Sequence, residues 1–216
     1  MTDRVAIWGA SGHALVVADI LRLTGRDIAG FIDDTATDRR GERFAGARVL
    51  GGRECLDGLR ADGVRSVAIA VGDCAARLRL ADVVREQGFE LAQAVHPRAV
   101  VAADVVLGAG TVVCAGAVVN PGSSIGECAI VNTSATIDHE CVIADGAHVG
   151  PGVHLGGRVR VGRGAWIGIG ATISDRVAIG AESIVGAGAV VLNDVPPRVV
   201  AFGVPARVVR DVSEGD

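Results

Sequence analysis

The chain has 216 residues, half of them apolar, a formal net charge of −4, and no lysine among its 21 basic residues. Without a basic block it has no electrostatic basis for binding nucleic acid, and without lysine it supports neither Schiff-base chemistry nor a Walker-type phosphate site. The five cysteines are an odd number with no C-x-x-C spacing, which favours neither a disulfide framework nor a zinc knuckle. No leader pattern and no apolar run of membrane-spanning length occur, so we expect a cytoplasmic protein that is not inserted into a membrane.

Residues 1–92 predict an α/β module. Short apolar runs (VAIW, IAGFIDD, SVAIAV) alternate with stretches whose apolar residues have helical spacing, at residues 14–23 and 75–87. Each of these stretches is followed by a glycine, a common helix stop. We expect a small Rossmann-like parallel sheet.

Polar loops follow three of the predicted strands. Gly9-Ala10-Ser11-Gly12-His13 joins the first strand to the first helix, Asp33-Asp34 ends the second strand, and Gly72-Asp73 ends the strand SVAIAV. Open sheets bind ligands at the carboxyl ends of their strands, and a helix N-terminus attracts anions. Taken singly, the glycine loop is also a routine tight turn and the acidic pair a solvated turn. Together, the three loops predict one crevice for a nucleotide.

Beyond residue 93 the period changes to six. An aliphatic residue recurs at seventeen consecutive positions from Val95 to Val191, often followed by glycine. One inward side chain in six predicts short strands wound around a narrow triangular core. The pattern resembles the parallel β-helix of hexapeptide acyltransferases, and this resemblance implies three hexapeptides, or eighteen residues, per coil. We expect the glycine after the aliphatic residue to supply a positive φ at each corner. A β-helix over residues 93–195 and a C-terminal tail over residues 196–216 complete the predicted organisation.

The segment Asn132–Cys141 carries a candidate base. His139 lies two places after the inward Ile137 and should face outward, where an imidazole can accept a proton near neutral pH and Glu140 can orient it. The alternative is an exposed structural histidine. Since eighteen residues make one coil, we expect Gly157 to offer its backbone amide beside His139.

Two other histidines, His148 and His154, are also expected to face outward. His148 lies half a coil from His139, so the two should point in different directions in one chain. We therefore expect a homotrimer with active sites between subunits if both serve one reaction. Zinc shared by outward histidines is an alternative, but their separate columns and the lack of an acidic ligand set disfavour it. Cys141 is expected at a core corner rather than as an exposed nucleophile.

The whole chain resembles the bacterial nucleotide-sugar N-acetyltransferases of glycan biosynthesis, a hexapeptide-repeat group that also includes sialic acid O-acetyltransferase-like proteins. The segments that carry the resemblance are GASGH at 9–13, FIDD at 31–34, VGD at 71–73, NTSATIDHE at 132–140, HVGPG at 148–152 and FGVPAR at 202–207. The resemblance implies a left-handed parallel β-helix, whereas general crossover rules would suggest a right-handed connection.

The resemblance also implies roles for individual residues. His139 matches the general base and Glu140 its partner, with acetyl-CoA as co-substrate and no metal. The nucleotide-sugar positions are Ser11, Gly12, His13, Asp33, Asp34 and Gly72, and Asn132 is an active-site polar position. The coenzyme positions are His148 at the acetyl end, Gly157, Ile169 and Ala187 along the pantetheine, and Arg207 near the phosphates.

Two features depart from, or add to, the pattern of related proteins. Ala14 stands where relatives commonly have glycine, and the Arg-rich residues 35–48 suggest a mobile loop over the nucleotide. The reaction expected is direct transfer of an acetyl group to the amine of a UDP- or GDP-linked 4-amino-deoxy sugar. O-acetylation of sialic acid or another sugar hydroxyl, and a non-catalytic trimeric scaffold, remain the alternatives.

Overall fold

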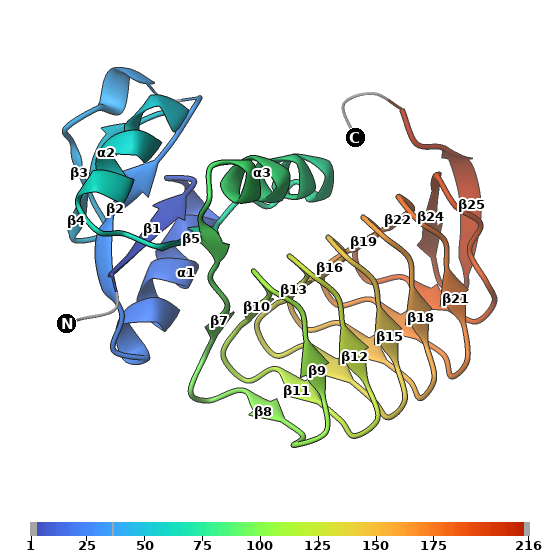
Figure 1. Ribbon diagram of the computed structural model, residues 1–216. Helices are drawn as coiled ribbons and strands as arrows, with labels where there is room; N and C mark the ends of the chain where they lie inside the picture. Colours follow the sequence, from blue (N-terminus) through green and yellow to red (C-terminus); the bar gives the residue numbers. More distant parts are fainter. Residues whose placement is uncertain (1–3, 36, 214–216) are drawn as a thin grey trace. The chain divides into compact units, whose positions relative to one another are not determined.

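The computed structural model describes residues 4–35 and 37–213, which form two compact units, Met1–Pro97 and Arg98–Asp216. The elements of the first unit are β1 (Arg4–Trp8), α1 (Gly12–Leu23), β2 (Asp27–Ile32), η1 (Thr37–Arg39), β3 (Arg43–Phe44), β4 (Ala47–Gly51), η2 (Arg53–Cys55), α2 (Leu56–Ala61), β5 (Ser66–Ile69), α3 (Cys74–Glu86), β6 (Glu90–Leu91) and β7 (Ala94–Val95). The two expected helices are confirmed, each to within two residues at either end (Figure 1).

The first unit is built on a six-stranded sheet with the order β3-β4-β2-β1-β5-β6. β1 pairs in parallel with both β2 and β5, and its residues are fully or largely buried from Val5 to Trp8. The expected small parallel sheet is therefore confirmed. Its edge differs from the expectation, because β3 pairs antiparallel with β4 within the segment that was expected to be a mobile loop.

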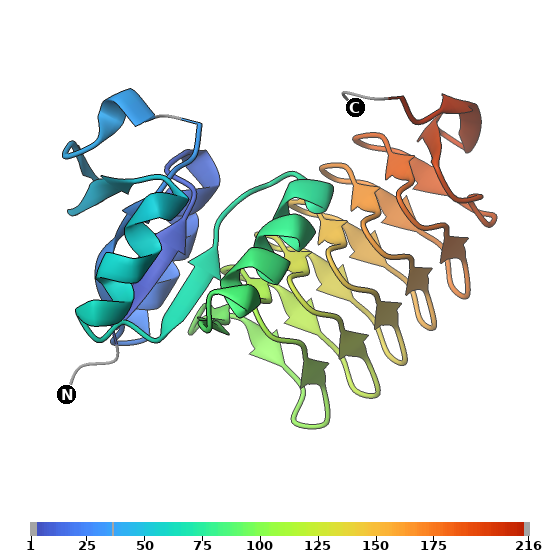
Figure 2. The same cartoon turned by 45° about the horizontal axis from the view of Figure 1, so that its top comes forward.

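The second unit is a stack of triangular coils (Figures 1 and 2). Its strands are β8 (Val100–Val101), β9 (Val106–Leu107), β10 (Val112–Val113), β11 (Val118–Val119), β12 (Ser124–Ile125), β13 (Ile130–Val131), β14 (Thr136–Ile137), β15 (Val142–Ile143), β16 (His148–Val149), β17 (His154–Leu155), β18 (Arg160–Val161), β19 (Trp166–Ile167), β20 (Thr172–Ile173), β21 (Ala178–Ile179), β22 (Ile184–Val185), β23 (Val190–Val191), β24 (Val199–Gly203) and β25 (Ala206–Asp211).

From β8 to β20, each strand pairs in parallel with the strand eighteen residues further on, for example Val112 with Ile130 and Ile130 with His148. The second residue of each two-residue strand points inward, and these aliphatic side chains are buried at every sixth position from Val113 to Val191. The first coil is less protected, since Val101 and Leu107 are half-buried. The predicted coil of three hexapeptides is confirmed.

The expected role of the glycines is wrong. Positive φ angles fall on every sixth residue from Gly110 to Gly188, two places after the glycines that follow the aliphatic positions. At Gly108, Gly126 and Gly162, a Cβ atom would come 2.5 Å from a backbone nitrogen of the next coil. At these glycines, the main chain of the next coil approaches too closely for a side chain.

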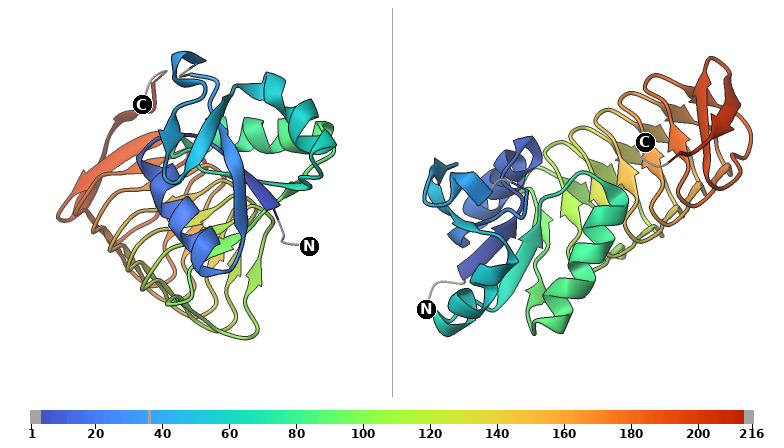
Figure 3. Two further views of the ribbon diagram at one scale, coloured as in Figure 1. Left: turned by 90° about the vertical axis from the view of Figure 1, so that its left-hand side faces the viewer. Right: turned by 90° about the horizontal axis from the view of Figure 1, so that it is seen from above.

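The segment expected as a tail adds two strands to the coil stack. β24 pairs in parallel with β22, and β25 folds back antiparallel on β24. Figure 3 shows this hairpin at the far end of the stack. Among the described residues, no helix combines the length and the apolar character that crossing a membrane requires.

Candidate active site

The three expected loops of the first unit leave the same edge of its sheet. The ends of β1, β2 and β5 are in register, since Trp8 pairs with both Ile32 and Ile69. Gly9 has a φ of 115°, and a Cβ there would lie 2.7 Å from the carbonyl oxygen of Ala70. Glycine is required at this position because the loop after β1 touches the end of β5. The convergence predicted from the sequence is confirmed.

The N-terminus of α1 opens at this edge. Ser11 is the N-cap residue, is exposed, and makes no capping hydrogen bond through its side chain. A Cβ built on Gly12 or on Gly72 would meet nothing within 4 Å. A ligand can therefore approach the backbone at both loops, and the helix N-terminus favours an anionic group there. The Ala14 methyl group is fully buried and does not reach this surface.

Asp33 and Asp34, the two acids of the second loop, hold the loop backbones in place through hydrogen bonds. Asp33 is buried and accepts a hydrogen bond from the backbone N–H of Ala10 at 3.0 Å through one oxygen and from Thr35 through the other. Asp34 accepts from the backbone and the guanidinium of Arg53, at 2.8 and 3.1 Å. Contacts of these acids with a nucleotide stay a prediction.

Two arginines hold the loops and were not singled out by the sequence reasoning. Arg77 of α3 is fully buried and donates through Nη1 to the carbonyl oxygens of Val71 and Gly72, at 2.9 and 2.7 Å. Arg39 donates to the carbonyl oxygen of Ala10 at 2.9 Å. The segment 35–48 thus contacts the first loop, as expected of a segment beside the nucleotide site.

His13 is held neutral within the first unit. Burial, with a further contribution from the Arg77 charge, lowers the pKa of His13 from 6.5 to about 4. Desolvation disfavours the charged imidazole, and a nearby cation adds to that effect.

We expect the folded first unit to lose stability as the pH falls from 6.5 to about 4, because in that range the unfolded chain binds a proton at His13 that the folded chain does not. The contribution of this group is fully present above pH 6.5, and its loss amounts to about 3 kcal/mol at most. Urea unfolding at pH 7 and pH 4.5 should show a smaller difference for His13→Gln than for the parent chain. An equal difference in both proteins would contradict the assignment.

In the second unit, the candidate base lies at a corner of the coils between β14 and β15. We call residues 138–140 and their equivalents one coil on, residues 156–158, the 140–158 corner. Glu140 and Arg158 occupy the left-handed positions of this corner, with φ angles of 58° and 62°. The backbone N–H of Arg158 donates to the carbonyl oxygen of His139 at 2.8 Å. The coil ladder itself therefore fixes these three residues beside one another.

His139 and Glu140 form the expected pair. His139 Nδ1 lies 3.0 Å from Glu140 Oε2, and both side chains are exposed. The same oxygen accepts a hydrogen bond from Arg158 Nε at 2.9 Å, and Arg158 Nη2 lies 2.8 Å from it in an ion pair. Hydrogen bonds from Arg158, and then from His139, lower the pKa of Glu140. An ionised Glu140 places the imidazole proton on Nδ1 and leaves the Nε2 lone pair for a substrate proton.

Gly157 makes room for the His139 ring but does not supply the free amide that was expected. A Cβ on Gly157 would lie 2.6 Å from His139 Nε2, which confirms that the two residues are adjacent. The backbone N–H of Gly157, however, donates to Asp175 Oδ1 at 3.1 Å. The expectation of a free amide beside the base is therefore wrong, because a carboxylate of the next coil takes it.

We expect Gly157→Ala to lower kcat about tenfold or more, because its methyl group displaces the imidazole from the position that accepts the substrate proton. The backbone of Gly157 does not have a positive φ, and its closest Cβ contacts are with the His139 ring. Little loss of stability should accompany the loss of activity. The substitution should have no further effect in a His139→Ala background, and a full additive loss there would contradict this explanation.

His148 lies elsewhere on the coil and is not exposed as expected. It is 6% exposed, and its ring packs on Trp166 with a centroid distance of 4.3 Å. Its Nε2 lies 3.1 Å from Asn132 Nδ2. Because Asn132 Oδ1 accepts from the backbone N–H of Thr133, the amide nitrogen faces His148, and the neutral imidazole carries its proton on Nδ1.

Asn132, Ile169 and Ala187 share a second corner, whereas Gly157, the other expected pantetheine position, lies at the 140–158 corner. We call residues 132–134, 150–152, 168–170 and 186–188 the 170–188 corner; it lies between the strands β13, β16, β19 and β22 and the strands β14, β17, β20 and β23. Ile169 is 63% exposed, and Ala187 is also exposed. Cβ atoms on Gly152, Gly170 and Gly188 would meet nothing within 4 Å. This corner presents an open edge along which an extended ligand can lie.

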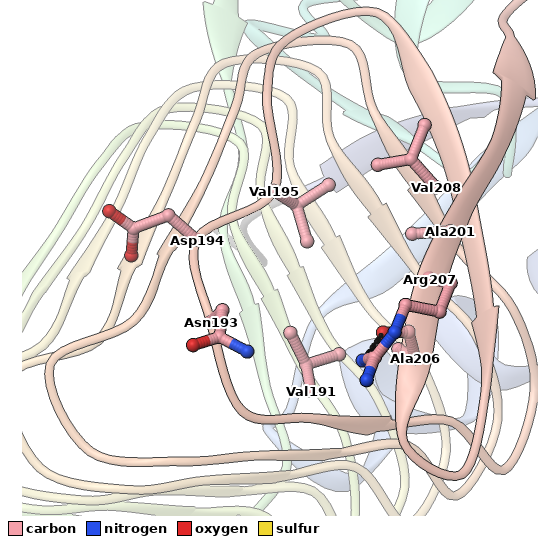
Figure 4. A pocket seen from close by; sticks show the side chains of 8 residues that line it. All are labelled: Val191, Asn193, Asp194, Val195, Ala201, Ala206, Arg207 and Val208. Atoms are coloured by element: carbon pink, nitrogen blue, oxygen red, sulfur yellow. Dashed lines mark hydrogen bonds between the residues drawn. The ribbon is translucent and has the colours of Figure 1, made fainter.

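Arg207 belongs to the hairpin that ends the stack. It lines a cavity of about 240 Å³ together with Val191, Asn193, Asp194, Val195, Ala201, Ala206 and Val208. Figure 4 shows Arg207 and Asn193 on the side of this cavity nearest Val191, where the guanidinium donates to the carbonyl oxygen of Ala206. Contact between Arg207 and coenzyme phosphates stays a prediction.

Cys141 is fully buried, and burial raises the pKa of its thiol, so it has the core-corner position expected of a residue that is not the nucleophile. Its Sγ lies 3.2 Å from the carbonyl oxygen of Gly156. Within residues 4–35 and 37–213, no group of three or more His, Cys, Asp or Glu side chains is placed to hold a metal ion.

Two family models match the chain: the PglD N-terminal domain over residues 4–84 and the bacterial transferase hexapeptide (six repeats) over residues 158–193. No curated protein matches the chain in sequence.

Solved structures match nearly the full length. A histidine variant of GDP-perosamine N-acetyltransferase from Caulobacter crescentus, in complex with CoA and GDP-perosamine, is 42% identical, with a TM-score of 0.92 over 96% of this chain and 97% of that one. The acetyltransferase domain of PglB from Neisseria gonorrhoeae, in complex with acetyl coenzyme A, is 33% identical, with a TM-score of 0.89 over 97% and 100%. WeeI from Acinetobacter baumannii is 28% identical, with a TM-score of 0.86 over 95% and 99%.

These matches confirm the fold class expected from the resemblance, an α/β module followed by a left-handed parallel β-helix. The chain belongs to the nucleotide-sugar acetyltransferases of the hexapeptide-repeat family.

Proposed function

We propose that the chain transfers the acetyl group of acetyl-CoA to the amine of a GDP-linked amino sugar of the GDP-perosamine kind. The observation that carries the proposal is the His139–Glu140 pair, with Nε2 left to accept a proton, in a chain that is 42% identical to a GDP-perosamine N-acetyltransferase. Of the two nucleotides that the sequence left open, this relative favours guanosine.

The step is a direct attack of the sugar amine on the thioester carbonyl. The new bond joins the amine nitrogen to the acetyl carbon, and the bond between that carbon and the CoA sulfur breaks. His139 Nε2 takes the proton that the amine loses, and the departing thiolate takes up a proton as CoA leaves. A covalent acyl-enzyme is not needed, in keeping with the burial of Cys141.

We assign the acetyl end of the coenzyme, and the stabilisation of the developing oxyanion, to His148 rather than to the amide of Gly157. That amide already donates to Asp175, whereas the Asn132 contact leaves the His148 proton on Nδ1, as a donor. Pantetheine then follows Ile169 and Ala187 along the 170–188 corner, and Arg207 meets the phosphates.

We further propose a homotrimer with sites between subunits. His139 lies at the 140–158 corner, whereas His148, Ile169 and Ala187 lie at or beside the 170–188 corner, so one chain presents the base and the coenzyme edge on different sides of its coil. A trimer brings the 140–158 corner of one subunit to the 170–188 corner of the next.

Mixed assemblies test this arrangement. His139→Ala and His148→Ala chains, each expected to be inactive alone, should regain activity when co-expressed. Some interfaces then join an intact His139 from one chain to an intact His148 from the other. Light scattering that gives a monomer mass, or mixed assemblies without any recovery, would contradict the composite site.

In this proposal residues 1–92 bind the nucleotide sugar through Ser11, Gly12, His13 and Gly72, with Asp33 and Asp34 shaping the loops or meeting the ribose. Residues 93–195 carry out the transfer, and residues 196–216 complete the coenzyme end. The five cysteines form no disulfide in the described part of the chain, and this suits a reducing compartment and supports a cytoplasmic location.

Thiol release from acetyl-CoA, measured with GDP- and UDP-linked 4-amino sugars and with free sialic acid, tests the substrate class. We expect turnover with a GDP-linked amine. Activity only with sialic acid would move the assignment to O-acetylation, and silence with every acceptor would support a non-catalytic scaffold.

A further inference from the structure

Arg158 contacts Glu140 beside the proposed base, and the proposed reaction does not explain this contact. It lies one coil beyond Glu140, and its Nε donates a hydrogen bond to Oε2, the same oxygen that faces His139 Nδ1, while its Nη2 lies 2.8 Å from that oxygen in an ion pair. A carboxylate used only to orient a histidine needs no cation on the same oxygen. The cation must therefore change either the position of the carboxylate or its electrostatic effect on the imidazole.

Both effects follow from the geometry. The guanidinium is planar and its two donors are fixed relative to each other, so it restricts the rotation of the Glu140 carboxylate. It also offsets the negative charge that, alone, would favour the protonated imidazole. A base that is already protonated cannot accept the proton of the substrate amine, so this charge balance decides how much enzyme is active near neutral pH.

We propose that Arg158 is a positioning residue that holds Glu140 on His139 Nδ1 and offsets the charge of this carboxylate beside the imidazole. The inference rests on the proposed function, in which His139 is the base.

The other charged groups around His139 do not replace Arg158. Asp138 Oδ1 accepts from the backbone N–H of His139 at 2.7 Å and from Asn120 Nδ2 at 3.0 Å. Asp175, one coil on, accepts from the backbone N–H of Gly157. Both are carboxylates, so neither supplies a positive charge. Among these groups, the guanidinium of Arg158 is the cation that pairs with Glu140.

Arg176 provides a matched control. It lies eighteen residues beyond Arg158 in the same column and has nearly the same backbone conformation, with a φ of 63°. It is a full coil further from Glu140, so its removal changes the charge of the protein equally without uncovering the Glu140 carboxylate.

The direct test follows the titration of the His139 ring by NMR in protein with isotope-labelled histidine, with the resonance assigned by its loss in His139→Ala. We expect Arg158→Gln to raise the midpoint by about 0.5 pH unit, and Arg176→Gln to leave it unchanged. In a Glu140→Gln background, Arg158→Gln should have a smaller effect, because without the carboxylate the guanidinium is no longer held beside the imidazole. Arg158→Lys, which keeps the charge, should restore most of the parent midpoint.

Activity gives a second readout. The acidic limb of kcat/KM against pH should move upward by the same amount in Arg158→Gln, about a threefold loss at pH 6 that vanishes near pH 8.5, with KM for acetyl-CoA unchanged. An unchanged midpoint in Arg158→Gln, or an equal rise in Arg176→Gln or in the Glu140→Gln background, would overturn the inference. Since the titration needs no substrate, a shifted midpoint in a chain that acetylates no amino sugar would refute the proposed function and leave the role of Arg158 intact.

Discussion

Replacing His139 with alanine is expected to lower kcat/KM for acetyl transfer about a thousandfold, the usual worth of a well-placed general base. In the proposed reaction, the variant loses the ring nitrogen that takes the amine proton. The loss should be mainly in kcat, with KM for acetyl-CoA almost unchanged, because His148, Ile169 and Ala187 lie at or beside the 170–188 corner. Steady-state thiol release with a GDP-linked amino sugar measures both parameters.

His154→Ala is the matched control for that experiment. His154 is an exposed histidine of β17, the strand that runs from the 170–188 corner to the 140–158 corner, and its Nδ1 lies 2.8 Å from Thr136 Oγ1. We expect nearly parental kcat and KM for this variant. A His139→Ala protein that retains most of its turnover would remove the base from the mechanism.

Gly162→Ala should destabilise the β-helix by about 3 kcal/mol, near the upper end of what overpacking usually costs. Its Cβ would lie 2.5 Å from the backbone nitrogen of Ala181 and 2.8 Å from Ala181 Cα. These are main-chain atoms of the next coil, and they cannot move aside as the end of a flexible side chain can. Relief requires the two coils to separate, which weakens their hydrogen-bond ladder.

Gly164→Ala, two residues away, separates this effect from the effect of backbone conformation. Gly164 has a φ of 65°, and its nearest Cβ contact is at an ordinary 3.6 Å, to Glu182 Cγ. The left-handed conformation costs an alanine about 1 kcal/mol. Urea unfolding should therefore rank Gly162→Ala clearly below Gly164→Ala. The reverse order would mean that glycine follows the aliphatic positions for its backbone freedom after all.

The difference between these glycines shows what the sequence does and does not reveal about the fold. The period of six follows directly from one inward side chain per strand, so coil length and core positions are predictable. The positive-φ positions carry no equally clear signal, because residues such as Cys128, Glu140 and Arg158 occupy some of them. The short antiparallel pair β3 and β4, two residues long on one side, is also too brief to leave a pattern.

The site shows the same division. His139, Glu140 and the three converging loops were predictable because each is local in sequence. The contact of Arg158 with Glu140 could also have been predicted, because the two residues are eighteen apart and therefore lie beside each other on successive coils. The role of Arg77 and the packing of Trp166 on His148 could not be predicted, because they depend on how a buried guanidinium and an indole ring pack in three dimensions.

The chemical identity of the product tests the central claim most directly. Parent enzyme, acetyl-CoA and GDP-perosamine are incubated together, and the acetylated nucleotide sugar is isolated by mass and treated with hydroxylamine, which cleaves esters and leaves amides intact. The account predicts a singly acetylated GDP-sugar that survives this treatment and is absent from the His139→Ala reaction. A hydroxylamine-sensitive product, or none while acetyl-CoA is consumed with another acceptor, would contradict it.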